Sequence, residues 1–496
     1  MGLTRKVAFN SSVQIIGRVV TTLIALITVK LLTNKLGPAG YGEYAAILNY
    51  IALFGTLADF GFYWILAKEL TEAEGDMAKT NYIMGNILAL RSFFALIVLS
   101  CAVVAIYLLP TGAIPILNGP VKLGVLMVAI STFWQTLNMT FVAIFQANYR
   151  MDRPVIADIV GRIVSLAVLL PFLWLGLNVA WLVSAMIFGA VANYYTNVLF
   201  ARQYTIVKFQ FDRGYWKRIF RESSVLGIVS VLALIYFKID SVILSIYKSA
   251  GDVGIYAAPY KVIEIINFFP AVFMGVVFIS LVQSWKDDHK RFQFLISRSI
   301  EAMFVLGLPI IIGGIILARP MMNFITSSDY SHASTVAIQL MGYSVAIDGA
   351  MVLRLLLVAV WFDFFANILG KGVIAMSRSR LLLIANIIAV VVNIGFNLFV
   401  IPRWSYLGAA LVTILTEALV LLAQSIIISK FIKVHIPWAV VGRTLVAVII
   451  MAAIIYPLRN SNLLYGIAVG AIVYCIAAWK TKAISEDVIK LVVKRV

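Results

Sequence analysis

The segment Tyr236-Phe-Lys-Ile-Asp-Ser-Val-Ile-Leu-Ser245 decides how the chain is interpreted, because it places a lysine and an aspartate inside an apolar run. A glycine turn, Gly251-Asp-Val-Gly-Ile-Tyr-Ala-Ala258, follows it. A second apolar run then begins Pro259-Tyr-Lys-Val-Ile-Glu264 and carries two further charges. In a membrane-spanning helix each such charge costs about 2.5–3.5 kcal/mol on insertion scales, so it needs a polar role or a partner. We therefore expect this hairpin to form one wall of a hydrated, charged interior.

The composition around this hairpin is that of a membrane protein. Of the 496 residues, 62% are hydrophobic and only 12% are charged. Apolar runs of about 20 residues have the length that crosses a bilayer as a helix, and the chain has room for about 14 of them. The sequence thus predicts an all-α polytopic membrane protein. The predicted spans are 11–34, 41–62, 81–109, 121–148, 154–174, 178–201, 219–245, 254–281, 298–325, 349–376, 380–401, 405–429, 438–458 and 462–480.

The net charge of +18 indicates an orientation in the membrane and not a nucleic-acid partner. With the N-terminus inside, 27 of the 40 lysine and arginine residues fall on inner segments and 6 on outer ones. Cytoplasmic loops of membrane proteins carry this excess of basic residues. We expect a multi-pass protein of the cytoplasmic (inner) membrane, with both termini in the cytoplasm and no nucleic acid bound.

Two pairs of similar short segments along the chain indicate an internal repeat. Gly42-Glu-Tyr-Ala-Ala46 opens the second span, and Gly254-Ile-Tyr-Ala-Ala258 opens the eighth. Residues 143–150 and 373–378 form the second pair of similar segments. Transporters are often built from such repeats, although chance similarity between apolar segments is the alternative. The predicted parts are an N-terminal lobe at 1–202, a cytoplasmic linker at 203–218, a C-terminal lobe at 219–433 and two appended spans at 434–496, with an insertion near 326–348.

Basic residues inside the predicted spans are the first candidates for a binding site. Lysine and arginine suit anionic groups such as phosphate and diphosphate. Arg18 and Lys238 carry the most weight, because neither has an acid one turn away on its own helix. The predicted substrate-binding residues of this cationic cavity are Arg18, Lys238, Arg91, Lys30, Lys261 and Arg354.

Local pairing is the alternative for several of these residues. Arg162 lies one helical turn after Asp158, which favours a structural ion pair. Lys261 and Glu264 are three residues apart and can satisfy each other in the same way. Lysine and arginine near the outer span ends can also extend to the lipid headgroups.

Acidic and amide residues within the spans are candidates for ion coupling. Asp363 and Glu417 fall near the bilayer centre, where an ionised carboxylate without partners is least tolerable, and Asp240 and Asp348 lie nearer the outer side. If the polar faces of spans 11 and 12 meet Asp240, they form an oxygen-rich pocket for a hard cation or a proton. The alternative is polar packing between helices. The predicted ion-coupling residues are Asp240, Asp363, Glu417, Asn393, Asn397 and Thr413.

Motifs of enzymes and metal sites are absent from the sequence. It contains no G-x-x-x-x-G-K-[ST], no G-x-S-x-G and no H-E-x-x-H. Cys101 and Cys475 lie inside apolar runs, and His289, His332 and His435 lie far apart, so neither a disulfide framework nor a metal site is expected. We expect a transporter with no cofactor other than H⁺ or Na⁺ as coupling ion.

The opening hairpin resembles the polysaccharide transporter (O-antigen, Wzx-type) lipid-linked oligosaccharide flippase family, within the multidrug/oligosaccharidyl-lipid/polysaccharide exporter superfamily. The resemblance lies in Lys238–Ser245 with Val253–Lys261, in Leu36–Tyr44 and in Leu57-Ala-Asp-Phe-Gly61. It implies two six-helix lobes arranged as a V around a central cavity, plus two C-terminal helices. It also implies ion-driven alternating access that turns a polyprenyl-(di)phosphate-linked glycan from the inner to the outer leaflet. Glycan assembly enzymes are its expected partners, and we expect it to act as a monomer.

Two other functions remain open from the sequence. A drug or small-cation exporter of the same superfamily would call for an acidic cavity, whereas the charges within these spans are mostly basic. A membrane glycan polymerase or glycosyltransferase would call for a large outer loop or an outward acidic pair, and most outer segments here are short.

Overall fold

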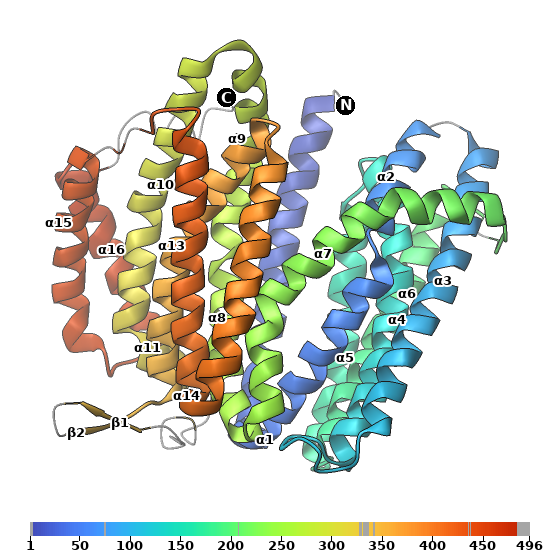
Figure 1. Ribbon diagram of the computed structural model, residues 1–496, viewed down its shortest axis with the longest axis horizontal. Helices are drawn as coiled ribbons and strands as arrows, with labels where there is room; N and C mark the ends of the chain where they lie inside the picture. Colours follow the sequence, from blue (N-terminus) through green and yellow to red (C-terminus); the bar gives the residue numbers. More distant parts are fainter. Residues whose placement is uncertain are drawn as a thin grey trace. The chain divides into compact units, whose positions relative to one another are not determined.

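The computed structural model of the chain describes residues 3–73, 76–206, 208–326, 330, 337–340, 343–434, 436 and 438–483. Nearly all of these residues are helical, as the sequence predicts (Figure 1). The elements, in chain order, are α1 Leu3–Asp59, α2 Phe62–Glu72, α3 Met77–Leu108, α4 Gly119–Ala147, α5 Asp152–Trp174, α6 Val179–Ala201, α7 Arg213–Tyr247, α8 Ala250–Ile266, α9 Phe268–Asp287, α10 His289–Ile316, α11 Ala318–Ile325, β1 Ala337–Leu340, β2 Tyr343–Ala346, α13 Gly349–Ala375, α14 Ser379–Ser429, α15 Trp438–Ile455, η1 Tyr456–Leu458 and α16 Leu463–Lys480.

Helices that could cross a membrane make up most of the chain. Within the described residues, 12 helical segments are long and apolar enough to do so. Two of them are unusually long, with 61 residues at Ser12–Glu72 and 51 at Ser379–Ser429. At about 1.5 Å per residue each would measure more than twice the ~30 Å of a bilayer core, so each must fold back on itself. The count of fourteen spans stays a prediction.

Backbone breaks fold these two long helices back. In α1, Gly37 has φ +63° and ψ −174° and is followed by Pro38, which cannot donate to the helix ladder. In α14, Ser405 has φ +47° and ψ −136°. Gly408 makes the second turn possible, because a Cβ there would lie 2.8 Å from Val400 Cγ1. Helix α14 is therefore a helical hairpin with two antiparallel halves.

Polar N-caps start two helices earlier than the sequence predicts. The spans predicted at 219–245 and 298–325 begin within helices that start at Arg213 and His289. Asp212 accepts hydrogen bonds from two backbone N–H groups at 2.8 and 3.0 Å, and Asp288 from two at 2.9 and 3.0 Å. Hydropathy detects only the apolar part of each helix, whereas the cap decides where the helix begins.

Two predicted spans are each divided in the structure. The span predicted at 254–281 consists of α8 and α9, which are separated at Asn267. Pro270 has no N–H, so the carbonyl group of Ile266 lacks its helical donor. The span predicted at 298–325 ends at Ile316 and is followed by the short helix α11. A window of uniform hydropathy hides both breaks.

The chain divides into two compact units, Met1–Gly254 and Ile255–Val496. The boundaries predicted at 202 and 218 lie within the first of these units, and the predicted division into lobes stays a prediction. Helix α8 begins in the first unit and continues into the second.

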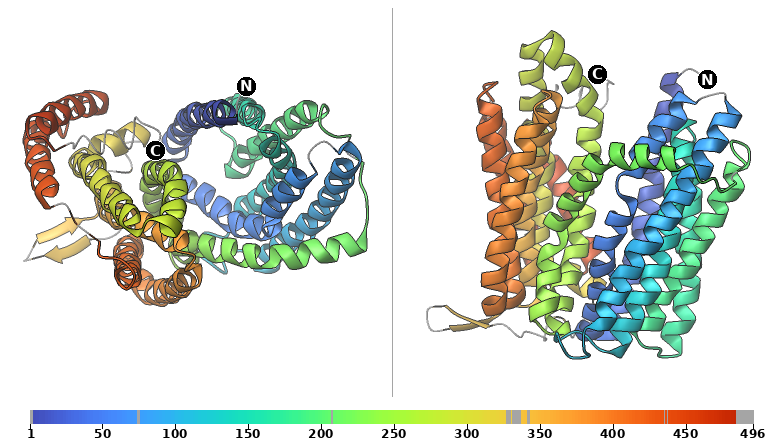
Figure 2. Two further views of the ribbon diagram at one scale, coloured as in Figure 1. Left: turned by 90° about the horizontal axis from the view of Figure 1, so that it is seen from above. Right: turned by 45° about the vertical axis from the view of Figure 1, so that its right-hand side comes forward.

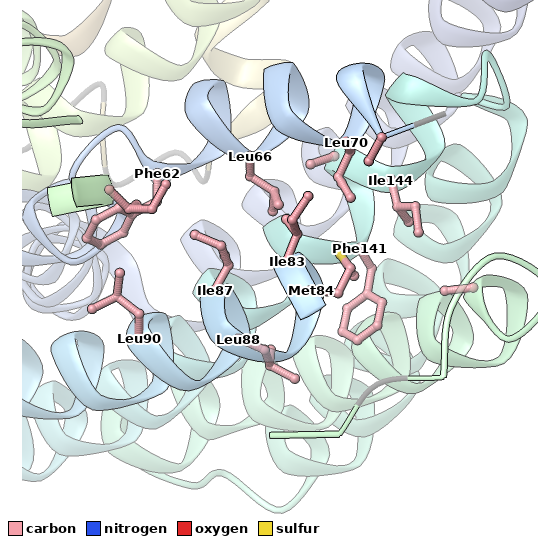
Figure 3. Packing of buried hydrophobic residues seen from close by; sticks show 14 of the residues in the cluster. Phe62, Leu66, Leu70, Ile83, Met84, Ile87, Leu88, Leu90, Phe141 and Ile144 are labelled. Carbon is pink, nitrogen blue, oxygen red and sulfur yellow. The ribbon is translucent and has the colours of Figure 1, made fainter. Parts of the chain in front are cut away.

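The first unit is a bundle in which α3, α4, α5 and α6 run side by side (Figure 2). An apolar cluster at one end joins α2, α3 and α4, with Phe62 and Leu66 facing Ile87 and Phe141 (Figure 3). The first turns of α7 complete this cluster, because Ile219 is fully buried in it. The apolar face of α7 therefore begins before its membrane-spanning part.

The second unit packs α13 against α9, α10 and α14, and α15 and α16 against α10. Strands β1 and β2 pair antiparallel, with Ala337 opposite Ala346. This short hairpin falls within the predicted insertion at 326–348, and the rest of the described fold is helical, as predicted. Residues 327–329, 331–336 and 341–342 of that insertion, like His332 and His435, lie outside the described residues.

The two glycines of the repeated Gly-x-Tyr-Ala-Ala motif meet in the first unit. A Cβ on Gly42 would lie 1.7 Å from the carbonyl oxygen of Ala250 and 2.8 Å from the nitrogen of Gly254. A Cβ on Gly254 would lie 1.9 Å from the carbonyl oxygen of Pro38. Only glycine allows two helix starts to approach this closely. The motif is thus a close backbone contact between α1 and α8.

Candidate functional site

A directional chain of hydrogen bonds crosses the α14 hairpin in the second unit. Asn397 Nδ2 donates to Asn393 Oδ1 at 2.9 Å, and Asn393 Nδ2 donates to Thr416 Oγ1 at 3.2 Å. The Thr416 hydroxyl donates in turn to the carbonyl of Val412 at 2.9 Å. The chain leaves Asn397 Oδ1, a buried acceptor, with no hydrogen-bond partner within the described residues. Such an acceptor attracts a donor, a water or a cation.

More oxygen atoms lie on the second half of the same hairpin. The Thr413 hydroxyl donates to the carbonyl of Ala409 at 2.9 Å, so Tyr256 is the donor in its 3.4 Å contact with Thr413 Oγ1. Glu417 lies one turn after Thr413. Carboxylate, amide and hydroxyl oxygens together form the ligand set that a hard cation prefers.

Asp240 is the predicted partner of this cluster from α7. Its side chain is buried, and its carboxylate accepts a hydrogen bond from the backbone N–H of Ser241 at 2.7 Å. Asp240 belongs to the first unit and the α14 cluster to the second. The meeting of Asp240 with Asn393 and Asn397 therefore stays a prediction. Asp348 instead caps α13, where it accepts from the N–H of Met351 at 2.8 Å.

Asp363 begins a second polar stripe in the second unit. Asn367 and Lys371 follow it at intervals of four residues, so the three side chains share one face of α13. That face packs on α9, because the ammonium of Lys371 lies 5.7 Å from the ring centre of Phe278. Asn367 Oδ1 is buried and accepts no hydrogen bond from a described residue.

The break between α8 and α9 lies at the level of Asp363. The rings of Phe364 and Phe269 are 6.2 Å apart, and together with the contact of Lys371 they give α9 and α13 a parallel register. Asn267, at the break, has a buried Oδ1 without a partner in the described part of the chain. Interrupted helices expose carbonyl groups that transporters use to hold cations. Asp363 thus lies at about the level of the break, on the same face of α13 as Asn367.

Arg91, a predicted substrate-binding residue, is enclosed in the first unit. Its side chain is 0% exposed and forms an ion pair with Asp59, which is 31% exposed. Its NH1 group also donates to the carbonyl of Thr136 at 3.2 Å and to Thr140 Oγ1 at 3.3 Å. Contact between Arg91 and a substrate would therefore require this network to open.

Three other basic residues of the predicted spans, Arg162 from the predicted ion pair and Lys261 and Arg354 from the predicted cavity, have local partners. Arg162 Nε lies 3.2 Å from Asp158 Oδ2, as the one-turn spacing predicts. Lys261 Nζ lies 2.8 Å from Glu264 Oε2. Arg354 Nε donates to the carbonyl of Ile315 at 3.2 Å, which ties α13 to α10.

Arg18, Lys30 and Lys238 all belong to the first unit. Arg18 and Lys30 are exposed on α1, and Lys238 is half-buried on α7, with its ammonium 5.6 Å from the ring centre of Phe237. Helices α1 and α7 pack against each other. Their role in a common binding site stays a prediction.

Sequence reasoning missed how firmly residues 203–218 are bound to the first unit. Glu69 on α2 accepts a hydrogen bond from the Tyr215 hydroxyl and lies 2.6 Å from the guanidinium of Arg218. The Tyr82 hydroxyl on α3 donates to Asp212 at 2.5 Å. In Figure 1 the first turns of α7 run across the end of α3. The spacing of these polar residues gave no signal, because the partners are more than 100 residues apart.

Residues 7–285, more than half of the chain, match the family described as "Polysaccharide biosynthesis protein". Two relatives have names that describe a transport function. A Shigella flexneri protein named "Putative O-antigen transporter" is 23% identical over 83% of this chain and 96% of its own length. A Haloferax volcanii protein named "Probable low-salt glycan biosynthesis flippase Agl15" is 24% identical over 56% of this chain and 58% of its own.

Among solved structures, the fold matches "Lipid II flippase MurJ, inward closed conformation" with a TM-score of 0.74. The match covers 93% of this chain and 97% of the other at 14% identity. It shows a shared helical architecture, in agreement with the membrane-transporter fold predicted from the sequence.

Proposed function

This chain belongs to the family of polysaccharide biosynthesis proteins, and from that membership we propose that it is a flippase for a polyprenyl-(di)phosphate-linked oligosaccharide. It moves this substrate from the inner to the outer leaflet of the cytoplasmic membrane, for export of a cell-surface polysaccharide. The family match confirms the resemblance indicated by the hairpin motifs. It is the observation that carries the proposal.

Physical chemistry explains why such a substrate needs a protein. A sugar headgroup cannot cross ~30 Å of hydrocarbon unaided, since its hydroxyl groups would lose their hydrogen bonds. A hydrated passage inside the protein replaces those hydrogen bonds, while the lipid tail stays in the bilayer. Arg18 and Lys238, charged residues within membrane-spanning helices, bind the phosphate groups on this passage.

Surface polysaccharide in a strain that lacks its own flippase tests the function. Wild-type protein is expected to restore the polysaccharide, and failure to do so while the chain extrudes cationic dyes would overturn the proposal in favour of a drug exporter. Lys238→Ala and Arg18→Ala are each expected to abolish export without changing the amount of protein in the membrane. Normal export by both variants would remove the basic residues from the mechanism.

Arg162→Ala supplies the matched control for these variants. Arg162 is also a basic residue within a membrane-spanning helix, but it is paired with Asp158. The side chains of this pair are 37% and 43% exposed, so losing it should cost less than losing the buried Asp59–Arg91 pair. Near-normal export by Arg162→Ala would show that the loss in the other variants is not a general effect of removing a charge.

A cation gradient drives the cycle in this proposal, with Na⁺ or H⁺ bound by the oxygen atoms of the second unit. The unsatisfied Asn397 Oδ1 and the stripe that begins at Asp363 support it. Asn397→Ala and Asp363→Asn are expected to make transport independent of one gradient, measured with Na⁺ replaced by K⁺ and with the pH gradient collapsed. Unchanged gradient dependence in both variants would reject these ligands.

Asn197→Ala provides the control for Asn397→Ala. Asn197 is equally buried, donates to Asn193 Oδ1 at 2.9 Å and also has an Oδ1 without a partner in the described residues. It lies on α6 in the first unit, and its side chain donates to Asn193 on α6 and Asn138 on α4, two helices without an acidic residue. The control is expected to lower stability while leaving the gradient dependence unchanged.

The proposal places both chain termini in the cytoplasm, in line with the distribution of lysine and arginine. It requires no second copy of the chain. Glycan assembly enzymes would deliver the substrate at the inner leaflet and use it at the outer one.

A further inference from the structure

A long apolar groove runs along α14 between the two halves of this helical hairpin, and we refer to it as the α14 groove. It encloses about 470 Å³, a volume in the range of ligand-binding pockets. One wall consists of residues between Leu381 and Val392, and the other of residues between Leu419 and Ile427. All the residues that line it are aliphatic.

The side-chain sizes explain why the groove exists. Ala385 and Ala389 on the first half and Ala423 on the second are small, and Ala389 is buried. The larger residues Ile384 and Leu422, which also line the groove, are both more than half exposed. Small residues along the floor and large ones beside them leave a channel between the two helices.

Three contacts give the register of the hairpin. Gly408 lies against Val400 at the closed end, and Asn393 donates to Thr416 Oγ1 at 3.2 Å further along. At the open end, the guanidinium of Arg378 lies 5.2 Å from the ring centre of Phe431. The groove therefore lies between the level of Thr416 and the open end, where α14 begins and ends.

Four exposed basic residues gather at this open end, and we refer to them as the basic cluster. Arg378 and Arg380 lie where α14 begins, and Lys430 and Lys433 lie just after it ends. Within the described part of the chain, no acidic side chain forms an ion pair with any of the four. An uncompensated positive charge thus lies at the mouth of an apolar channel.

We propose that the α14 groove holds the isoprenoid chain of a polyprenyl phosphate carrier while the basic cluster binds its phosphate, an assignment that rests on the proposed function. The wall from Leu381 to Val392 spans eleven residue steps, or about 16 Å along the helix, so it contacts the part of the chain nearest the phosphate. Arginine and lysine are the side chains that bind phosphate oxygens.

The surrounding lipid explains why the groove and the basic cluster contribute differently to binding. Lipid tails are as apolar as the groove, so moving a tail into it gains little from the hydrophobic effect, and shape and packing decide which tail fits. The phosphate supplies the electrostatic attraction and the direction of binding. The two parts together select a phosphorylated lipid with a slender, methyl-branched chain.

A helix of a second copy is the other occupant that a small-residue floor could accept. A two-fold axis normal to the membrane would then bring both basic clusters to the same membrane face, where like charges repel. The charge at the mouth therefore favours an anionic lipid over a second copy.

Binding of undecaprenyl phosphate to the purified full-length protein, titrated by native mass spectrometry, tests the assignment. Ala423→Phe fills the groove, and the double variant Arg380→Glu/Lys433→Glu reverses half of the basic cluster. Each is expected to weaken binding about tenfold or more, since each removes one of the two recognised parts. A photoactivatable isoprenoid phosphate is expected to label peptides from 381–392 or 419–427.

Matched variants control for general effects on the membrane region. Leu383→Phe adds the same ring to the first half of α14 at a position that does not line the groove. Arg403→Glu reverses a charge near the closed end of the hairpin. Both are expected to bind the lipid within about twofold of wild type.

Several results would overturn the assignment. They are unchanged binding by both test variants, equal affinity for phosphatidylglycerol, equal affinity for undecaprenol without phosphate, full competition by inorganic phosphate alone, and a dimer that Ala423→Phe dissociates. Lipid binding is measured without transport, so the two proposals fail separately. If the wild-type protein binds the lipid but exports no glycan, the flippase proposal is rejected and the groove assignment stands. If the protein exports glycan and all the variants bind the lipid normally, the groove assignment is rejected and the flippase proposal stands.

Discussion

At the scale of single residues, the Asp59–Arg91 pair shows how the stability of the fold depends on the counter-ion of a buried charge. Asp59→Asn leaves the fully buried Arg91 guanidinium without its counter-ion. Removing one partner of a buried pair costs about 3–5 kcal/mol, and the partial exposure of Asp59 favours the lower end of that range. We expect a clearly lower midpoint of thermal unfolding for the purified variant.

Two further variants separate this effect from other causes. Asp158→Asn breaks a pair whose side chains are 37% and 43% exposed, so it should change the midpoint little. Adding Arg91→Met to Asp59→Asn removes the stranded charge and should recover much of the loss. Equal midpoints for Asp59→Asn and Asp158→Asn would contradict the structural role of the buried pair.

The sequence predicts only those residue contacts that lie within a turn or two. The spacings of Asn393 with Asn397 and of Asp158 with Arg162 place both pairs in contact before any coordinates exist. Tyr256 and Thr416 were missed, because their partners are brought to them by helix packing and not by spacing. The pairing of Arg91 with Asp59, from a different helix, was missed for the same reason.

At the scale of helices and their connections, the close contact of Gly42 and Gly254 leads to a prediction. Gly254→Val places a side chain where a Cβ already meets the Pro38 carbonyl at 1.9 Å, so α1 and α8 must separate. We expect lower yield and lower thermal stability for this variant. Gly251→Val, whose Cβ would meet its nearest neighbour at 3.7 Å, is the control and should be close to wild type.

The attachment of residues 203–218 leads to a prediction about pH. The hydrogen bond from Tyr82 to the Asp212 carboxylate, with backbone N–H donors, lowers the pKa of Asp212 below its usual value. A depressed folded pKa stabilises the attachment above the usual aspartate pKa, and that contribution is lost as the pH falls through the folded value. Acid should therefore release this segment.

Tyr82→Phe tests that dependence. It removes the largest cause of the lowered pKa, so release should occur at a higher pH than in wild type. Cleavage by an acid-tolerant protease after Phe209 or Phe211, followed as the pH is lowered, reports the release. The same pH profile in both proteins would contradict the role of this hydrogen bond.

Helix positions were easier to predict from the sequence than helix ends. The apolar runs locate the helices, because the bilayer requires apolar surface over its whole thickness. The predicted starts of α7 and α10 lay several residues too far along the chain. Asp212 and Asp288 cap first turns that are not apolar, so hydropathy does not detect them. The break at Asn267 was also missed, although Pro270 is the residue that signals it.

At the scale of the whole molecule, the distribution of basic residues predicts the topology. Single cysteines at Lys208 and Lys290 should react with a membrane-impermeant maleimide only in inverted vesicles, and one at Arg459 only in intact cells, in a background without Cys101 and Cys475. The expected pattern follows from the 27 basic residues on inner segments against 6 on outer ones. The reverse pattern would contradict the proposed direction of transport.

The class of the molecule was predictable from its composition and motifs, and the helical fold and the family agree with that prediction. The β1–β2 hairpin was not predicted, because strands of four residues are too short to be detected in a search for membrane-spanning apolar runs. The α14 groove escaped notice for a related reason. The groove depends on which residues of two antiparallel helices face each other and on the volumes of their side chains. A hydropathy profile along the chain records neither.

The binding of residues 203–218 to α2 and α3 also limits how this gene can be divided for expression from two plasmids. A split near residue 210 would give α7 to the second polypeptide while its partners Glu69 and Tyr82 stay on the first. A split after Ser249 would separate Gly42 from Gly254 in the same way. Either pair of polypeptides would have to find each other in the bilayer before the first unit could close, a search that the continuous chain avoids.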